Sequence, residues 1–141
     1  MKFIYFIFLS LIAFSCHVND NSQQEISNVL KNQTDEWNKG NVDGFMQGYW
    51  NSKELRFITK RGIKFGYDSV SNGYKRSYNT KEKMGELTFS KLQFFDLNDK
   101  DLKQVFGMWK VSKINETDSG NFSLIFKQID GHWKIIIDHT W

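Results

Sequence analysis

The sequence predicts a single α+β domain in which helices come first and an antiparallel sheet follows. Apolar residues recur at helical spacing in the first part of the chain, whereas from Leu55 onward the period changes to two. The chain has 141 residues, 40% hydrophobic and 25% charged, so one hydrophobic core serves the whole molecule. Aromatic residues make up 16% and proline is absent, which excludes a disordered tail or a proline-rich ligand.

Charge and cysteine content exclude several classes of protein. Lysine and arginine total 19 against 16 acidic residues, and the formal charge of +3 is far below the clustered basicity that phosphate binding demands. Cys16 is the only cysteine, which excludes disulfide scaffolds and cysteine-rich zinc sites. His17, His132 and His139 share no ligand spacing, and no phosphate-binding glycine loop is present. We therefore expect no metal, no cofactor and no nucleic-acid partner.

Residues 1–15 predict a secretory signal peptide, because the apolar run after Lys2 has about 12 residues where a membrane span needs about 20. The run ends at Ala13-Phe14-Ser15-Cys16, which resembles the lipobox of bacterial lipoproteins. Cys16 then becomes the lipidated N-terminus, residues 16–24 form a polar tether, and the lipid is the only membrane contact. This predicts a protein of the bacterial cell envelope, in the periplasm or at the outer membrane. The alternative is ordinary cleavage that leaves Cys16 as a free thiol.

Two helices are predicted at the start of the folded domain. Apolar residues recur at helical spacing over about 23–39, with Ser22 and Glu25 as a possible capping box. Gly40 ends this helix, and a short second helix follows through Trp50. The two helices are expected to form an αα-hairpin.

The rest of the domain predicts strands, with one helix inserted among them. Residues 55–59 and 63–66 form the first strand pair, and Asp68 is expected to cap a third helix. Beyond Met84 every apolar run predicts sheet. The four expected strands lie at about 87–95, 105–111, 122–129 and 133–139.

The last two strands can be placed in register, because Asp130-Gly131 is a strong signal for a two-residue type I′ turn. Counting back from this turn sets Phe122 opposite His139, on an inner face that is almost entirely large and apolar. Neighbours on a strand point to opposite faces, so Asp138 is expected on the other side of the sheet. The pair Asp138-His139 is therefore not expected to act as a catalytic dyad.

The opposite face of this hairpin is mixed in polarity. The same register pairs Lys127 with Lys134 and Ile125 with Ile136. An apolar pair on an otherwise polar face suits contact with a second copy, and we expect a homodimer that forms through the sheet.

Short motifs recur along the chain in the order of two helices, a strand pair, a third helix and a long-stranded sheet. They are Trp37-Asn38-Lys39-Gly40-Asn41, Gly44-Phe45-Met46, Tyr49-Trp50, Leu55-Arg56-Phe57, Gly66-Tyr67, Met84-Gly85-Glu86-Leu87-Thr88-Phe89-Ser90, Gly107-Met108-Trp109, and Gly131-His132-Trp133-Lys134-Ile135 with Asp138-His139-Thr140. In this order and combination the chain resembles the nuclear transport factor 2-like superfamily, also called SnoaL-like or ketosteroid-isomerase-like. Within it, the chain resembles a bacterial branch of unknown function, over roughly residues 25–141.

The resemblance implies a cone-shaped, curved antiparallel sheet wrapped around the N-terminal helices, in a cystatin-like topology, with a pocket at the open end. Members of the superfamily include isomerases, cyclases, dehydratases and pure binding or oligomerisation modules, so the fold alone decides no reaction. Isomerase relatives use a carboxylate base on the pocket wall with hydrogen-bond donors opposite. No such base is identifiable from this sequence, because Asp68 is explained as a helix cap and Asp96, Asp99 and Asp101 as loop residues.

Arg56 and His139 are the most informative candidate binding residues. If Leu55 and Phe57 pack into the outer layer, Arg56 points into the cone and could clamp a carboxylate or another anion. The alternatives for Arg56 are an exterior position or a structural ion pair with a helix carboxylate such as Glu36, and the alternative for His139 is a hydrogen-bonded core residue. The full candidate lining of the pocket is Tyr49, Trp50, Arg56, Tyr67, Trp109 and His139.

Three functions from different classes remain open. The first is a binding domain without catalysis for a small, partly apolar and anionic molecule. The second is an enzyme of isomerase, cyclase or dehydratase type, which needs an acidic residue that faces the cavity. The third is a dimeric interaction module whose pocket is filled by its own side chains.

Overall fold

The computed structural model describes residues 21–141, and the predicted signal peptide, Cys16 and most of the tether lie outside the described residues. The helices are α1 (Ser22–Asn38), α2 (Val42–Met46), α3 (Tyr67–Ser77) and α4 (Lys81–Met84). The strands are β1 (Arg56–Thr59), β2 (Gly62–Phe65), β3 (Glu86–Asp96), β4 (Leu102–Ser112), β5 (Thr117–Ile129) and β6 (His132–Thr140). Among these residues no helix is both long and apolar enough to cross a membrane.

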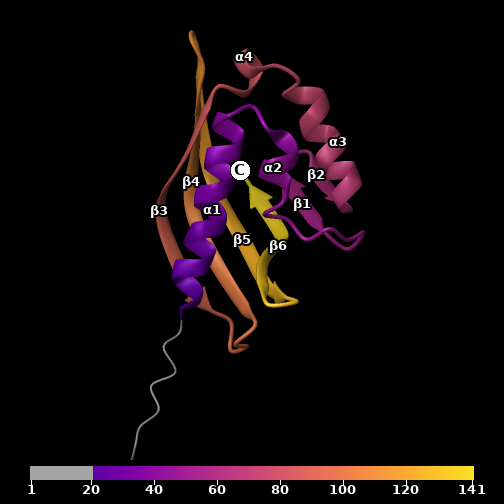
Figure 1. The fold of residues 1–141 in the computed structure, drawn as a ribbon, viewed down its shortest axis with the longest axis vertical. Helices are drawn as coiled ribbons and strands as arrows, with labels where there is room; N and C mark the ends of the chain where they lie inside the picture. Colours follow the sequence, from indigo (N-terminus) through magenta and orange to yellow (C-terminus); the bar gives the residue numbers. More distant parts are fainter. Residues whose placement is uncertain (1–20) are drawn as a thin grey trace, which may run out of the picture.

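The six strands form one curved sheet in the order β2-β1-β6-β5-β4-β3. All neighbouring strands are antiparallel except β1 and β6, which run parallel. Figure 1 shows the sheet curving around α1, with α2 and α3 over the end that carries β1 and β2. The predicted α+β fold class, a curved sheet wrapped around N-terminal helices, is confirmed.

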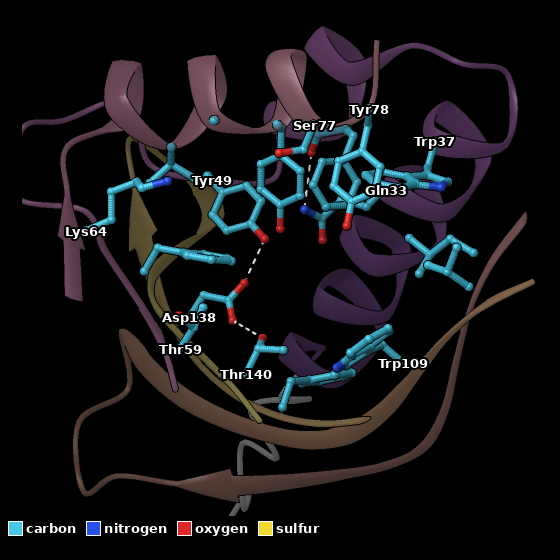
Figure 2. A pocket seen from close by; sticks show the side chains of 18 of the residues that line it. Gln33, Trp37, Tyr49, Thr59, Lys64, Ser77, Tyr78, Trp109, Asp138 and Thr140 are labelled. Carbon is cyan, nitrogen blue, oxygen red and sulfur yellow. Dashed lines mark hydrogen bonds between the residues drawn. The ribbon is translucent and has the colours of Figure 1, made fainter. Parts of the chain in front are cut away.

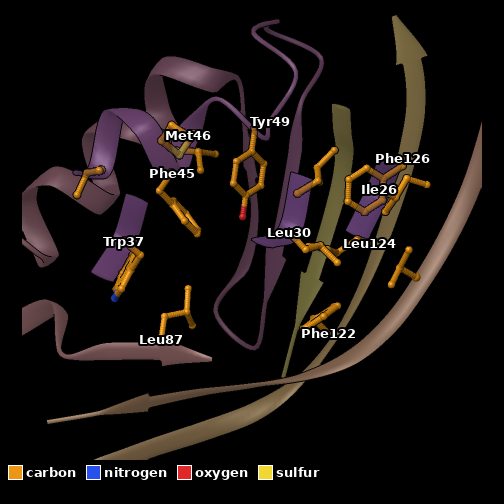
Figure 3. Close-up of a cluster of buried hydrophobic side chains, with 14 of the residues drawn as sticks. Ile26, Leu30, Trp37, Phe45, Met46, Tyr49, Leu87, Phe122, Leu124 and Phe126 are labelled. Carbon is orange, nitrogen blue, oxygen red and sulfur yellow. The ribbon is translucent and has the colours of Figure 1, made fainter. Parts of the chain in front are cut away.

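The helices bury one face each against the concave side of the sheet. In α1 the buried residues follow the predicted spacing, from Ile26 through Leu30 to Trp37. They meet Phe126 and other inward residues of the long strands in one continuous core (Figure 3). Burial of this apolar surface is the main term that holds the helices on the sheet.

The helix starts differ from the predicted ones. α1 begins at Ser22 itself, with Asn21 as N-cap, and Glu25 accepts a hydrogen bond from the Trp133 indole at 2.9 Å instead of completing a capping box. α3 begins at Tyr67 rather than after Asp68, which lies in the first turn. The short α4 was not predicted, because its four residues carry no apolar periodicity.

The last hairpin follows the predicted register only as far as Ile135. Beyond that residue β6 contains a bulge at Ile136, so that Leu124 faces Asp138 and Ser123 faces His139. A bulge adds one residue to one strand and exchanges the faces of all that follow. Asp138 therefore points into the cone, and His139 points out.

The outer face of the sheet changes accordingly. Lys127 faces Lys134 as predicted, but the partner of Ile125 is Ile137 and not Ile136. An apolar pair is therefore present on this face, as the expected homodimer required, but it is formed by Ile125 and Ile137.

Candidate functional site

The concave side of the sheet and the helices enclose a cavity of about 660 Å³. Many aromatic side chains line it, and its walls come from α1, α2, α3, the β1–β2 hairpin and the inner face of β3 to β6. It opens where its lining residues are exposed, at the β1–β2 turn and the end of α3, and we call this opening the mouth. The structure thus places a cavity inside the cone, with one acidic side chain, Asp138, deep in its wall.

The Asp138 carboxyl group is held by two hydroxyl groups. Tyr49 Oη donates to Oδ2 at 2.8 Å, and Thr140 Oγ1 donates to Oδ1 at 2.7 Å (Figure 2). Asp138 is 4% exposed, and this burial raises the pKa of its carboxyl group, although the two hydrogen bonds act in the opposite direction. A carboxyl group with a raised pKa inside a cavity is the kind of group that binds or transfers protons.

Two tyrosines surround this carboxyl group. Burial raises the pKa of both Tyr49 and Tyr74, and the nearby charge of Asp138 raises each further. Both phenols therefore remain protonated donors in the neutral pH range. The Tyr74 ring packs edge-on against Phe45 and Phe57, with centroids 5.2 and 5.8 Å apart, which fixes its position.

Trp109 supplies a further donor from β4. Its indole Nε1 is buried and has no hydrogen-bond partner among the described residues. Trp109 also lines the cavity, together with Thr140 and Asp138 on the same inner face of the sheet. A buried donor without an acceptor is uncommon in a folded protein and costs stability.

The mouth of the cavity is cationic. Lys60, Arg61, Lys64 and Arg76 all belong to its lining, and within residues 21–141 none of them forms an ion pair. Among the described residues that line the cavity, only Asp118 and the buried Asp138 are acidic. The described residues include no group of three or more side chains suited to hold a metal ion.

The structure brings together two of the six predicted lining residues, Tyr49 and Trp109. The placement of Trp50 in the pocket is wrong, because Tyr49 points inward beside Ile135 and its chain neighbour points away. Tyr67 is also outside the cavity, half-buried at the first position of α3.

Arg56 and His139 lie on the outer face of the sheet. Leu55 is fully buried and Phe57 lines the cavity, so the residue between them is exposed on the other side. His139 faces outward because of the β6 bulge, and its ring lies 4.9 Å from that of Trp141. The predicted anion clamp and the predicted inner histidine are therefore wrong.

Asp138 is a candidate site residue that the sequence did not assign. Its signal is present in the sequence as a carboxylate in an apolar strand, but the register needed to turn it inward depends on the bulge. Thr140 was missed for the same reason.

No family model matches the sequence, and no curated protein matches it. Many solved structures are similar to it. One is an NTF-2-like protein of unknown function from Shewanella oneidensis, 33% identical, with a TM-score of 0.80 over 84% of this chain and 98% of that one. A putative scytalone dehydratase from Novosphingobium aromaticivorans, 10% identical, matches 84% of this chain and 82% of its own with a TM-score of 0.70.

A protein with a cystatin-like fold from Nostoc punctiforme is similar at 14% identity, with a TM-score of 0.67 over 84% of this chain and 88% of that one. At this identity the likeness concerns the fold alone. The Shewanella protein is different, because its identity is higher and the match covers almost its whole length. On that match, together with the cone and its cavity, the chain belongs to the nuclear transport factor 2-like family.

Proposed function

We propose that the protein binds a small, partly apolar molecule inside the cone. The observation that carries this proposal is the cavity of about 660 Å³, whose aromatic walls surround one buried carboxyl group. Ligand sites in proteins are concave and mostly apolar, with a few polar groups that orient the ligand. Asp138 with Tyr49 and Thr140 supplies such a polar group at depth.

The fluorescent probe N-phenyl-1-naphthylamine tests this proposal, because it is neutral and becomes bright in apolar surroundings. We expect a saturable rise in its fluorescence with the purified protein. Thr59→Trp places a large ring at the mouth and should abolish the rise, since Thr59 lines the cavity. The matched control is Thr88→Trp, which makes the same change on the exposed outer face of β3.

Two results would contradict the proposal. One is no saturable binding by the unaltered protein. The other is equal binding by Thr59→Trp and Thr88→Trp, which would place the probe outside the cone.

A second candidate function, proton transfer by Asp138, is favoured by its position. An enzyme of isomerase or dehydratase type needs an acidic residue that faces the cavity, and Asp138 does so with a raised pKa. Its two carboxylate oxygens have lone pairs beyond those that accept from Tyr49 and Thr140. A donor that polarises a substrate oxygen would come from Tyr74 or Trp109.

Hydrogen–deuterium exchange on 2-tetralone tests whether the protein transfers protons. The protein should speed deuterium uptake at the α-carbon of 2-tetralone in D₂O, observed by NMR, relative to buffer. Asp138→Asn should return the rate to that of buffer while N-phenyl-1-naphthylamine still binds. Uptake that is unchanged by Asp138→Asn would exclude Asp138 as the base.

We also propose that the protein is exported and anchored through a lipid on Cys16, as its lipobox-like junction predicts. Mass spectrometry of the mature protein from a bacterial membrane fraction should find a diacylglyceryl group on an N-terminal Cys16. Cys16→Ser should release the protein from that fraction. A mature chain that begins elsewhere with an unmodified thiol would overturn the proposal.

A further inference from the structure

We infer that the cavity recognises an organic anion, with the Lys64 ammonium group as its cationic partner and the Trp109 indole N–H as a second donor. This rests on the proposed binding function and names the chemical class of the ligand. Two glycines carry the inference, Gly73 in α3 and Gly120 in β5. At Gly73 the missing side chain makes room for the Lys64 ammonium group, and at Gly120 it makes room for the Trp141 carbonyl oxygen and the Trp109 indole.

Lys64 reaches the cavity from the edge of the sheet. It is paired with Phe57 across β1 and β2, and cross-strand partners share a face, so both side chains point inward. A Cβ atom at Gly73 would lie 2.8 Å from Lys64 Nζ, which places the ammonium group directly against the α3 backbone. Figure 2 shows the Lys64 nitrogen directed toward the tyrosines of the cavity.

No acidic side chain among residues 21–141 forms an ion pair with this ammonium group. Gly73 lies inside α3, where glycine costs about 1 kcal/mol of helix stability relative to alanine. Glycine thus weakens α3 at Gly73, the position where the methyl group of an alanine would displace the Lys64 ammonium group. An exposed, unpaired cation at the mouth of the cavity favours an anionic ligand.

Trp109 shows the same arrangement on β4. Its indole lies over Gly120, where an added Cβ atom would press on the Trp141 carbonyl oxygen and come within 2.8 Å of Nε1. That Nε1 is buried and finds no acceptor in the described part of the chain. A ligand oxygen at this position would accept a hydrogen bond from a donor that no described residue satisfies.

The two donors reach the cavity from different walls, with Asp138 and Thr140 between them in the view of Figure 2. Both Asp138 oxygens already accept hydrogen bonds, so an anionic group is expected at the Lys64 side rather than at Asp138. Arg61 and other cations of the mouth would attract the same charge. The fitting class is a small aromatic or alicyclic molecule with an anionic group and a further acceptor.

A matched pair of probes tests the charge alone. 1-Anilinonaphthalene-8-sulfonate is N-phenyl-1-naphthylamine with one added sulfonate, so the two differ by an anion on the same rings. We expect the protein to bind the sulfonate at least tenfold more tightly, at about 0.15 M salt, where attraction between distant charges is screened. Lys64→Met should lower that affinity by at least about tenfold, because it removes a charge-assisted bond.

Further variants distinguish a specific contribution of Lys64 from the effect of positive charge anywhere on the protein. Lys110→Met removes the same charge from the exposed outer face of β4 and should leave both affinities unchanged. Lys64→Arg should retain the preference for the sulfonate. Trp109→Phe replaces the indole with a smaller phenyl ring that has no N–H, and should weaken binding of the sulfonate more than binding of the neutral probe.

The outcomes distinguish the two proposals. If neither probe binds, the binding function itself fails. If the neutral probe binds and the sulfonate is not preferred, or if Lys64→Met and Lys110→Met lower its affinity equally, the anion site is overturned while the binding function stands.

Discussion

Asp138 concentrates the chemistry of the cavity in one side chain. It is 4% exposed, and its carboxyl group accepts from two neutral hydroxyl groups, those of Tyr49 and Thr140. Two such bonds offset only part of the lost hydration of a charged carboxylate, which is why its pKa is raised. The folded state thus disfavours the charged form of Asp138.

This predicts how stability depends on pH. Because the pKa of Asp138 is raised in the folded state above its usual value near 3.8, the folded state binds the proton more tightly than the unfolded one. The stabilising contribution of protonated Asp138 is present at low pH and is lost as pH rises through the folded pKa. Urea unfolding between about pH 4 and pH 7 should show unaltered protein losing stability relative to Asp138→Asn as pH rises. A constant difference between the two would contradict a raised pKa.

Tyr49→Phe predicts a change at the same carboxyl group. The Tyr49 hydrogen bond lowers the pKa of Asp138, so its removal should raise that pKa further. The variant should also lose about 1–3 kcal/mol of folding free energy, because a buried acceptor loses its donor. Carbon NMR of the Asp138 carboxyl group measures the pKa. Tyr67→Phe, which removes a hydroxyl outside the cavity, is the control and should leave the titration unchanged.

At the scale of elements, the helices and the final turn were predictable because their signals are local. The buried stripe of α1 and the Asp130-Gly131 turn both appear where the spacing places them. The bulge in β6 was not predictable, since Ile135, Ile136 and Ile137 are identical and carry no alternation that marks the extra residue. The bulge also depends on contacts with distant parts of the sequence, because β6 is hydrogen-bonded to β5 on one side and to β1 on the other. The extra residue in β6 therefore exchanged the predicted faces of Asp138 and His139.

The glycine in α3 gives a prediction for a whole element. Gly73→Ala should stabilise the helix by up to about 1 kcal/mol, since alanine has the higher helix propensity and only the flexible end of Lys64 must move. The melting temperature should rise while the preference for the sulfonate probe falls. Gly62→Ala is the contrasting variant: nothing lies near its added Cβ, but its φ of 113° disfavours alanine, so that variant should melt lower. A lower melting temperature for Gly73→Ala would show that the Lys64 position is rigid.

At the scale of the whole molecule, the two faces of the sheet differ in what covers them. The concave face is covered by the helices, whereas no helix covers the outer face in Figure 1. The outer face carries exposed apolar side chains toward its β3 edge, where Phe95 and Phe106 are 45% and 36% exposed, with their rings 5.7 Å apart. Beside them Ile125 pairs with Ile137. Exposed apolar groups that gather on one sheet face are typical of a protein interface.

We therefore predict that the purified protein is a dimer at micromolar concentration, joined through this outer face. A stable interface covers about 800 Å² of each partner, which a long-stranded sheet face provides. Ile137→Lys should give a monomer in sedimentation, because it places a charge in the apolar centre of the contact. Ile114→Lys makes the same substitution in the β4–β5 turn, at a residue 92% exposed, and should remain dimeric. Since neither change touches the cavity lining, both variants should still bind N-phenyl-1-naphthylamine. Unaltered protein that sediments as a monomer would exclude the dimer, and Ile137→Lys that stays dimeric would move the contact to another surface.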